Sequence, residues 1–298
     1  MKKIIYNVIK YPLILIFLKT PLINILKKRF KFHIYTLKKR NIIMHTLDTV
    51  FQREYFNKLK SKDEIRELTD STSVSGEEYA RSYYEKHFQT VEELKNRKLG
   101  LMSQYEASII FKKIINYIKK NNLEKNKNVY LIQMGSASGR DLEFFYKIYP
   151  ELNYISTDVN DEILNFQKKK YNYQNFKFFK CYAEEIEECI RHFGLENKII
   201  ILFSIGCLQH VNPYFMKEFF LKIRNINNLN LFINDPVSLS FIDSKEDLSK
   251  FRGNSSFSHK YADYAKDGKV LEEKIVRPYD KNDPIHKDTG IYYLHLKS

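Results

Sequence analysis

The 298-residue sequence has no tryptophan and only three cysteines. Cys181, Cys189 and Cys207 are odd in number and show no C-x-x-C spacing. This pattern argues against a disulfide framework and against a zinc site, and it fits a protein of the reducing cytoplasm. Hydrophobic residues make up 43% of the chain. Together with the length, this predicts one large domain, or one domain with a sizeable accessory region.

Acidic residues are missing before Asp48, whereas residues 1–47 contain eleven lysines or arginines. The whole chain carries a net charge of +14, so the other 251 residues carry only 14 − 11 = +3. An enzyme that acts on nucleic acid would need its positive excess in the folded domain. Nucleic acid is therefore not the expected partner.

Long apolar runs are also lacking near the start of the chain. The longest uncharged run of residues 1–30 is the eight residues Tyr11 to Leu18, whereas a bilayer span needs about 20. Pro12 interrupts this run, and no small-x-small cleavage site follows it, so a signal peptide fits poorly. We interpret residues 1–40 as a basic amphipathic arm whose residues 1–30 contact the inner face of the membrane. The alternative is a helix packed on the domain with its lysines in water.

Three domains follow from this pattern: the arm, a helical cap region over residues 41–125, and a catalytic domain over residues 126–298. The cap region includes an amphipathic run from Glu106 to Ile118 that ends in two lysines. A packing subdomain is the alternative for this region.

From Val129 onward, strand and helix patterns alternate. The sequence predicts strands at 129–134, 154–157, 176–181, 199–203 and 229–233, and helices at 141–146, 161–170, 184–193 and 213–226. Such alternation is typical of an α/β fold with a Rossmann-like, doubly wound parallel sheet, which binds ligands at the carboxyl ends of its strands.

A run of small residues follows the first strand: Gly135, Ser136, Ala137, Ser138 and Gly139. Small residues let backbone N–H groups approach a ligand at a helix N-terminus, so we expect Gly135 to leave space for a cofactor. A dinucleotide fingerprint would need glycine or alanine at position 140, which is Arg140. The spacing instead resembles the first motif of class I S-adenosylmethionine-dependent methyltransferases, acid-x-G-x-G-x-G. Gln133 replaces the acid of that motif, and Ala137 replaces its second glycine.

Three later strand ends strengthen this resemblance. Asp158 follows the second strand, 19 residues beyond Gly139, where a carboxylate can accept hydrogen bonds from a ribose diol. The segment 179–186 resembles the family's third motif, although Tyr182 stands where Asp is usual. The segment 203–211 resembles the family's Ser-x-Gly-x-Leu-x-His-Val segment. The resemblance implies that the cofactor contacts Gln133, Gly135, Ser136, Ala137, Gly139, Asp158, Val159, Tyr182, Ala183, Ser204, Ile205 and Gly206. It also implies a seven-stranded sheet with an antiparallel last strand, and residues 269–277 and 290–296 are compatible with the last two strands.

Methyl transfer is an in-line displacement in which the enzyme positions the acceptor and supplies a base where the acceptor is a hydroxyl. The candidates near the cleft are His210, Asp235 and, from the C-terminal segment, His259 and Tyr261; of these, His210, Asp235 and His259 are the predicted catalytic residues. A structural role in a turn is the alternative for His210, and an ordinary Asp-Pro turn is the alternative for Asp235. Residues 257–261 resemble a segment of bacterial methyltransferases from surface-glycan clusters. No Asn-Pro-Pro-Tyr segment, which would indicate methylation of a flipped base, follows the fourth strand.

These observations predict an S-adenosylmethionine-dependent methyltransferase of polysaccharide biosynthesis that O-methylates a sugar or related group of a cell-surface glycan precursor. Small-metabolite or RNA methylation is the alternative activity. A degenerate cofactor-binding scaffold is the non-enzyme alternative, and Gln133 and Ala137 are its support.

Overall fold

The computed structural model describes residues 102–245, 247–253, 256–265, 268–277 and 288–298, with side chains from residue 109 onward. The predicted basic arm, and residues 41–101 of the predicted cap region, lie outside the described residues. No helix in these described ranges is both long enough and apolar enough to cross a bilayer.

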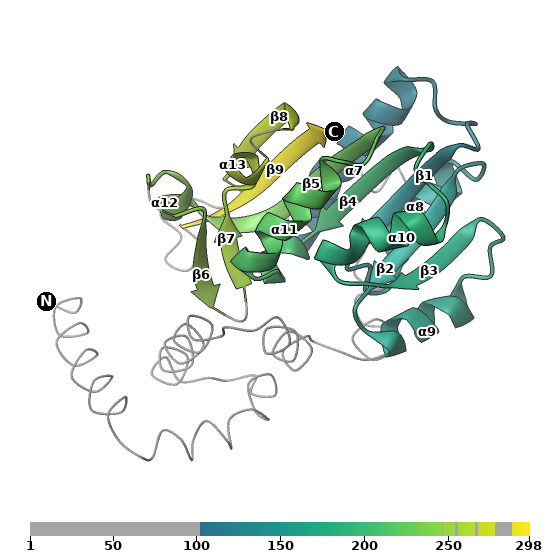
Figure 1. Ribbon diagram of the computed structural model, residues 1–298, viewed down its shortest axis with the longest axis horizontal. Helices are drawn as coiled ribbons and strands as arrows, with labels where there is room; N and C mark the ends of the chain where they lie inside the picture. The colour runs from purple at the N-terminus through teal and green to yellow at the C-terminus, as the bar shows by residue number, and fades with distance from the viewer. Residues whose placement is uncertain (1–101, 246, 254–255, 266–267, 278–287) are drawn as a thin grey trace, which may run out of the picture. The chain divides into compact units, whose positions relative to one another are not determined.

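A seven-stranded sheet with the order β3-β2-β1-β4-β5-β9-β8 forms the centre of the fold (Figure 1). Its strands are β1 (Val129–Met134), β2 (Asn153–Asp158), β3 (Phe176–Lys180), β4 (Ile199–Ile205), β5 (Leu229–Ser238), β8 (Lys269–Val276) and β9 (Thr289–Lys297). Strands β1 to β5 pair with one another in parallel, and β9 is antiparallel to both β5 and β8. The predicted α/β fold, a doubly wound seven-stranded sheet with its last strand antiparallel, is confirmed. This is the sheet that the resemblance implies.

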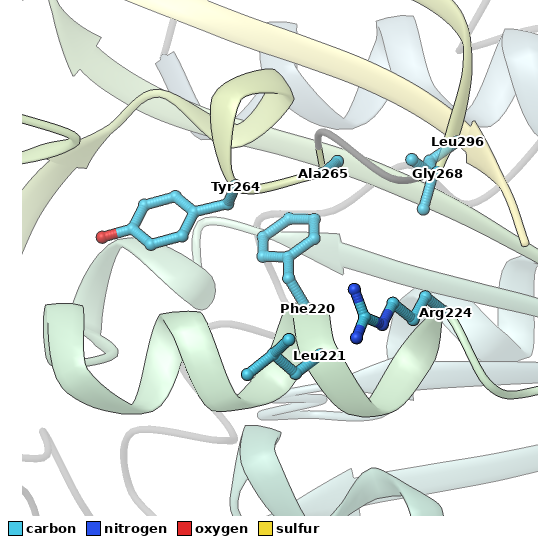
Figure 2. Close-up of a pocket in the computed structure, with 7 residues that line it drawn as sticks. All are labelled: Phe220, Leu221, Arg224, Tyr264, Ala265, Gly268 and Leu296. Carbon is cyan, nitrogen blue, oxygen red and sulfur yellow. The ribbon is translucent and has the colours of Figure 1, made fainter.

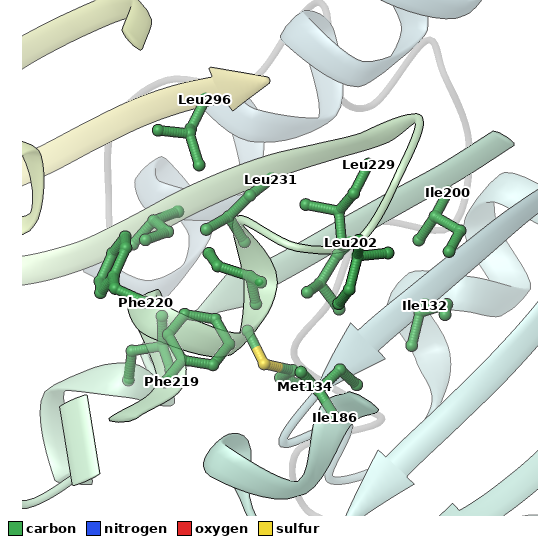
Figure 3. Packing of buried hydrophobic residues seen from close by; sticks show 14 of the residues in the cluster. Ile132, Met134, Ile186, Ile200, Leu202, Phe219, Phe220, Leu229, Leu231 and Leu296 are labelled. Carbon is green, nitrogen blue, oxygen red and sulfur yellow. The ribbon is translucent and has the colours of Figure 1, made fainter. Parts of the chain in front are cut away.

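Helices cover both faces of this sheet, so its central strands β1 and β4 are buried on both sides. Helices α7 (Met102–Lys120) and α8 (Arg140–Ile148) pack on one face. Helices α10 (Ile186–His192) and α11 (Pro213–Ile223) pack on the other, where α11 contributes Phe219 and Phe220 to the core in Figure 3. Helix α9 (Asp161–Lys170) follows β2 and contacts β2 and β3.

Local sequence signals set several boundaries. Asn212 caps α11, because its Oδ1 accepts the backbone N–H of Tyr214 at 3.0 Å, and Pro213 occupies the first helical position. Asn160 caps α9 in the same way through the N–H groups of Glu162 and Ile163. Strand β1 and helix α9 have the predicted bounds.

The predicted end of β5 at residue 233 is wrong, because β5 continues to Ser238. Residues 234–238 pair with Thr289–Tyr293 of β9, so Asp235 lies inside a strand and does not start a turn. Beyond Asn234, β5 pairs with β9 alone, a position that tolerates Pro236. The sequence also gave no sign of the small sheet of β6 (Ser249–Gly253) and β7 (Ser256–His259), which precedes the short helix α13 (Tyr261–Tyr264).

Candidate functional site

The small-residue turn after β1 has a strained backbone. Gly135, Ala137 and Gly139 have φ values of 61°, 47° and 71°, a region that costs a residue with a side chain about 1–2 kcal/mol. Two contacts hold Ala137 there: its N–H donates to Asp158 Oδ2 at 3.1 Å, and its carbonyl accepts Gln167 Nε2 at 2.7 Å. These bonds stabilise alanine where the family motif has glycine.

The two glycines of the turn pack against protein atoms. A Cβ built on Gly135 would lie 2.3 Å from Cys207 Sγ, and one built on Gly139 would lie 2.6 Å from Cε2 of Tyr171. The expectation that Gly135 leaves space for a cofactor therefore needs correction, because Cys207 occupies that space. Glycine is required there so that the loop after β1 can pack against the loop after β4.

Helix α9 holds the turn from the side. The fully buried side chain of Gln167 donates to Ser136 Oγ at 2.9 Å and accepts a hydrogen bond from Ser156. The hydroxyl of Tyr171 donates to the carbonyl of Ser138 at 2.8 Å. Neither Gln167 nor Tyr171 is among the residues predicted for the site. The spacing of Gln167 could have indicated its burial, because it lies four residues after Ile163 and so on the same buried face of α9.

Asp158 lies at the end of β2 beside this turn. Its Oδ1 accepts the N–H of Asn160 at 3.1 Å, and its Oδ2 accepts the N–H of Ala137. Burial raises the pKa of the Asp158 carboxyl, although these backbone hydrogen bonds oppose the rise. A carboxylate has about four acceptor sites, so Asp158 can still accept a hydrogen bond from a ribose hydroxyl.

Gln133 lies near the end of β1, where its Nε2 donates to Asp141 Oδ2 at 2.6 Å. Both side chains are buried. Gln133 Oε1 has no hydrogen-bond partner within the ranges that the structure describes. The carbonyl of Gln133 accepts the hydroxyl of Thr157 at 2.9 Å, which joins β1 to β2 near their ends.

The ends of β3 and β4 complete the edge. Tyr182 and Ala183 follow β3 and are half-buried, as is Val159 after β2. Ser204 lies in β4 and is fully buried, and its Oγ accepts the N–H of Leu208 at 3.3 Å. Ser204 thus shapes the loop after β4. The four strand ends that carry the predicted cofactor residues lie at one edge of the sheet, on either side of the point where the strand order reverses.

Asp235 lies on β5, next to the loop after β4. It is fully buried, and Tyr261 OH donates to its Oδ2 at 2.7 Å. Burial raises the pKa of Asp235 to about 7, although the bond from Tyr261 and the charge of Arg252 lower it. A carboxyl group with this pKa can exchange a proton near neutral pH.

His259 ends β7 and is also fully buried. Its Nδ1 forms a hydrogen bond with Ser249 Oγ at 2.6 Å, and that hydroxyl also bonds Tyr264 OH at 2.7 Å. Burial lowers the pKa of His259 to about 3. The ring is therefore neutral at physiological pH, and its Nε2 has no hydrogen-bond partner in the described segments.

The three predicted catalytic residues share one neighbourhood. His210 is exposed at the end of the short 3-10 helix η2 (Leu208–His210), against which both β5 and β7 pack. Repulsion between the protonated forms of His210 and His259 contributes to the lowered pKa of His259. Tyr261, the fourth candidate, pairs with Asp235; the sequence did not indicate this pairing, because the two lie 26 residues apart and on different elements.

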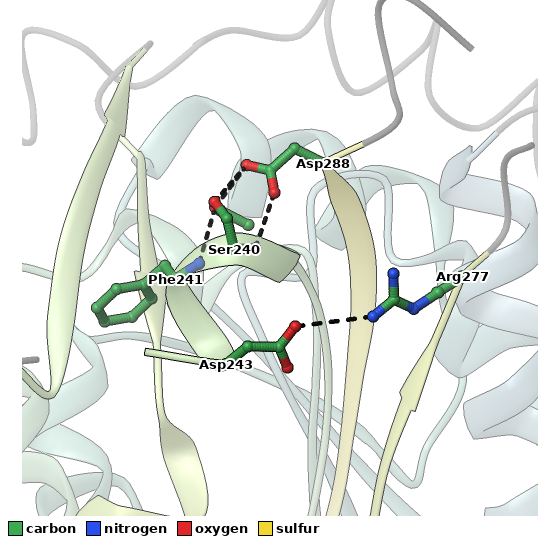
Figure 4. Close-up of polar contacts among 6 residues, drawn as sticks. Ser240, Phe241, Asp243, Arg277 and Asp288 are labelled. Atoms are coloured by element: carbon green, nitrogen blue, oxygen red, sulfur yellow. Dashed lines mark hydrogen bonds and ion pairs between the residues drawn. The ribbon is translucent and has the colours of Figure 1, made fainter. Parts of the chain in front are cut away.

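Two further features border this neighbourhood. Asp288 accepts hydrogen bonds from the hydroxyls of Ser238 and Ser240, and so ties the end of β5 to the start of β9 (Figure 4). A pocket between α11, α13 and β9 lies beyond Tyr264; it is lined by Phe220, Leu221, Arg224, Tyr264, Ala265, Gly268 and Leu296 (Figure 2). The described residues contain no group of three or more His, Cys, Asp or Glu side chains that could hold a metal ion.

Comparison with known proteins gives a fold relationship. No protein-family model and no curated protein sequence matches the chain significantly. Among solved structures, the chain is similar to coclaurine N-methyltransferase bound to N-methylheliamine and S-adenosylhomocysteine, with 10% identity, a TM-score of 0.46, and coverage of 94% of this chain and 100% of that one.

Two bacterial methyltransferase structures are also similar. One is an S-adenosylmethionine-dependent methyltransferase from Anabaena variabilis, with 13% identity, a TM-score of 0.44, and coverage of 73% of this chain and 93% of that one. The other is from Clostridium acetobutylicum, with 13% identity, a TM-score of 0.45, and coverage of 74% and 98%.

Proposed function

We propose that this protein is an S-adenosylmethionine-dependent methyltransferase. The observation that carries the proposal is the arrangement of four strand ends at the switch point of the sheet, with Asp158 bonded to the backbone of the small-residue turn. Ligands of doubly wound sheets bind at this point. The fold similarity supports the same reading.

The residues present fit this cofactor. Asp158 can accept a hydrogen bond from the ribose diol, because its backbone partners leave part of its acceptor capacity open. Gln133 Oε1 is a buried acceptor that has no partner among the residues described, so it suits a ligand with N–H donors. When bound, S-adenosylmethionine supplies a methyl group on a sulfonium, which makes that methyl electrophilic.

Asp235 is the residue best suited to take a proton from an acceptor. With a pKa raised to about 7, a substantial fraction is ionised at neutral pH, and the ionised form is a stronger base than an ordinary carboxylate. The hydrogen bond from Tyr261 fixes its orientation. His259, with a pKa lowered to about 3, is a weaker base than Asp235, and its catalytic role stays a prediction, as does that of the exposed His210.

The proposed acceptor is a hydroxyl of a sugar or related group in a cell-surface glycan precursor. A base near neutral pH supports a hydroxyl acceptor, because a hydroxyl must lose its proton during methyl transfer. We further propose that residues 1–30 bring the enzyme to the inner face of the membrane, where lipid-linked precursors would be accessible. This part rests on the eleven basic residues and missing acids of the first 47 residues.

Calorimetric titration of the full chain tests the cofactor. We expect micromolar binding of S-adenosylmethionine and S-adenosylhomocysteine and no binding of NAD. Asp158→Asn should weaken binding about 10–100-fold by removing charge-assisted hydrogen bonds. Asp161→Asn is the matched control, because Asp161 is exposed and pairs with Lys180 on the surface. Absence of binding to every nucleotide would reject the enzyme and favour the scaffold.

Transfer of a radiolabelled methyl group tests the acceptor. The full chain and labelled S-adenosylmethionine are incubated with lipid-linked saccharides, with total RNA, or with a small-metabolite extract. Label in the saccharide fraction that resists mild alkaline hydrolysis supports an ether on a sugar. Label in the RNA or metabolite fraction alone would replace the glycan proposal with one of the alternatives.

A further inference from the structure

The start of α8 carries a carboxylate next to the position where the resembled motif has its acid. Gln133 is neutral, but its Nε2 donates to Asp141 Oδ2 at 2.6 Å. Asp141 lies eight residues later in the chain, in the first turn of α8. Gln133 is 2% exposed and Asp141 is 4% exposed. The negative charge absent from the end of β1 is therefore present beside it, on another element.

A second observation points to a ligand. Gln133 Oε1 is buried and has no hydrogen-bond partner among the described residues, whereas the Nε2 of the same amide is engaged with Asp141. Native proteins rarely leave a buried polar atom unsatisfied. The end of β1 thus presents a carboxylate and an open amide oxygen side by side, and both groups are acceptors.

We propose that Gln133 and Asp141 together bind the α-ammonium group in the amino-acid part of the cofactor, with Asp141 supplying the charge. The inference rests on the proposed function and names the residues that recognise that part of the ligand. An ammonium has three N–H donors and a positive charge, which match an amide oxygen and a carboxylate.

A purely structural explanation is that Asp141 stabilises the positive N-terminus of α8. That role leaves the open oxygen of Gln133 unexplained. Glu143 lies in the same first turn and forms an ion pair with Lys147 at 3.2 Å. It therefore provides a matched acid for which we infer no ligand role.

The test compares two ligands by calorimetry on the full chain. S-adenosylhomocysteine contains the amino-acid part, and 5′-methylthioadenosine lacks it. Asp141→Asn keeps the shape of the side chain and an oxygen for Gln133. We expect it to weaken S-adenosylhomocysteine binding at least about tenfold and to leave 5′-methylthioadenosine binding unchanged. The control Glu143→Gln should change neither affinity.

A double variant that moves the carboxylate from position 141 to position 133 sharpens the test. Gln133→Glu combined with Asp141→Asn moves the carboxylate to the position used by the family motif, and we expect it to restore most of the lost affinity. A second comparison uses the wild type alone and so does not depend on whether any variant folds. Deaminated S-adenosylhomocysteine should bind to it at least about tenfold more weakly than S-adenosylhomocysteine itself.

Each failure has a distinct reading. If the wild type binds neither nucleoside, the proposed function fails. If it binds both and Asp141→Asn weakens neither, or weakens both equally, the cofactor stands but Asp141 does not recognise the ammonium. Equal binding of the deaminated compound and its parent would overturn the inference without any substitution.

Discussion

The two halves of the candidate site differ in what their polar side chains bond to. In the half after β1 and β2, Asp158, Gln167 and Tyr171 are hydrogen-bonded to the backbone of the small-residue turn. In the half around β5 and β7, Asp235 and His259 instead bond the side-chain hydroxyls of Tyr261 and Ser249. Hydrogen bonds to the backbone fix the shape of the turn, whereas bonds between side chains fix the orientation of two fully buried titratable groups.

The pKa values of Asp235 and His259 move in opposite directions from the same cause. Burial disfavours the charged form of each group, which raises the pKa of Asp235 to about 7 and lowers that of His259 to about 3. Near pH 6 both groups are mainly uncharged.

Gly135→Ala should give the largest effect, because it disrupts the packing of the turn after β1 against the loop after β4. The new Cβ would clash with Cys207 and force a left-handed alanine, and we expect a loss of about 2–5 kcal/mol in the free energy of unfolding. Urea denaturation of the full chain measures it. Gly194→Ala is the control, because Gly194 has a φ of 63° and no atom within 4 Å of its Cβ position, so it isolates backbone strain. Equal losses would mean that Cys207 moves aside at little cost.

Asp235→Asn should reveal the titration in the second half. Between the unfolded pKa of 3.8 and the folded value of about 7, folded Asp235 keeps a proton that the unfolded chain has lost. Its contribution to stability is therefore present at low pH and is lost as the pH rises toward 7. Relative to wild type, the variant should gain about 3 kcal/mol between pH 4.5 and pH 8.

Urea denaturation at both pH values checks this gain. Asp243→Asn is the control, since Asp243 is exposed and pairs with Arg277 (Figure 4). A gain that is independent of pH would show that Asp235 titrates as an ordinary carboxyl.

His259→Asn should produce the opposite dependence on pH. Below the unfolded pKa of 6.5, the unfolded chain binds a proton that folded His259 refuses down to about pH 3. Wild-type stability is therefore lost as the pH falls below 6.5. The variant can keep the bond to Ser249, and its loss between pH 6.5 and pH 5 should be about 2 kcal/mol smaller. Urea denaturation at several pH values measures this difference. If the stability of variant and wild type changed equally with pH, folded His259 would not be neutral in this range.

Tyr171→Phe should have the smallest effect. It removes the 2.8 Å hydrogen bond to the carbonyl of Ser138 while keeping the ring that packs beside Gly139. We expect a loss of about 1 kcal/mol in stability, with a weaker cofactor affinity measured by calorimetry. Tyr214→Phe is a suitable control because Tyr214 is 64% exposed. A loss in stability without any change in affinity would show that cofactor binding does not depend on this hydrogen bond.

The sequence determined the alternation of strands and helices, the bounds of β1 and α9, and the position of Asp158 at a strand end. Burial of a strand and capping of a helix leave their marks within a few neighbouring residues, as at Val129–Met134 and Asn160. Such features can be inferred without knowing what packs against them.

Only the tertiary structure decided which groups meet. Asp235 lies in a strand because β9 pairs with it from more than 50 residues away, and Tyr261 reaches it from α13. Asp141 meets Gln133 because α8 begins beside the end of β1. Such contacts join residues of different elements, and burial then sets their pKa values. The contacts that bring these particular side chains together leave no mark in the neighbouring sequence.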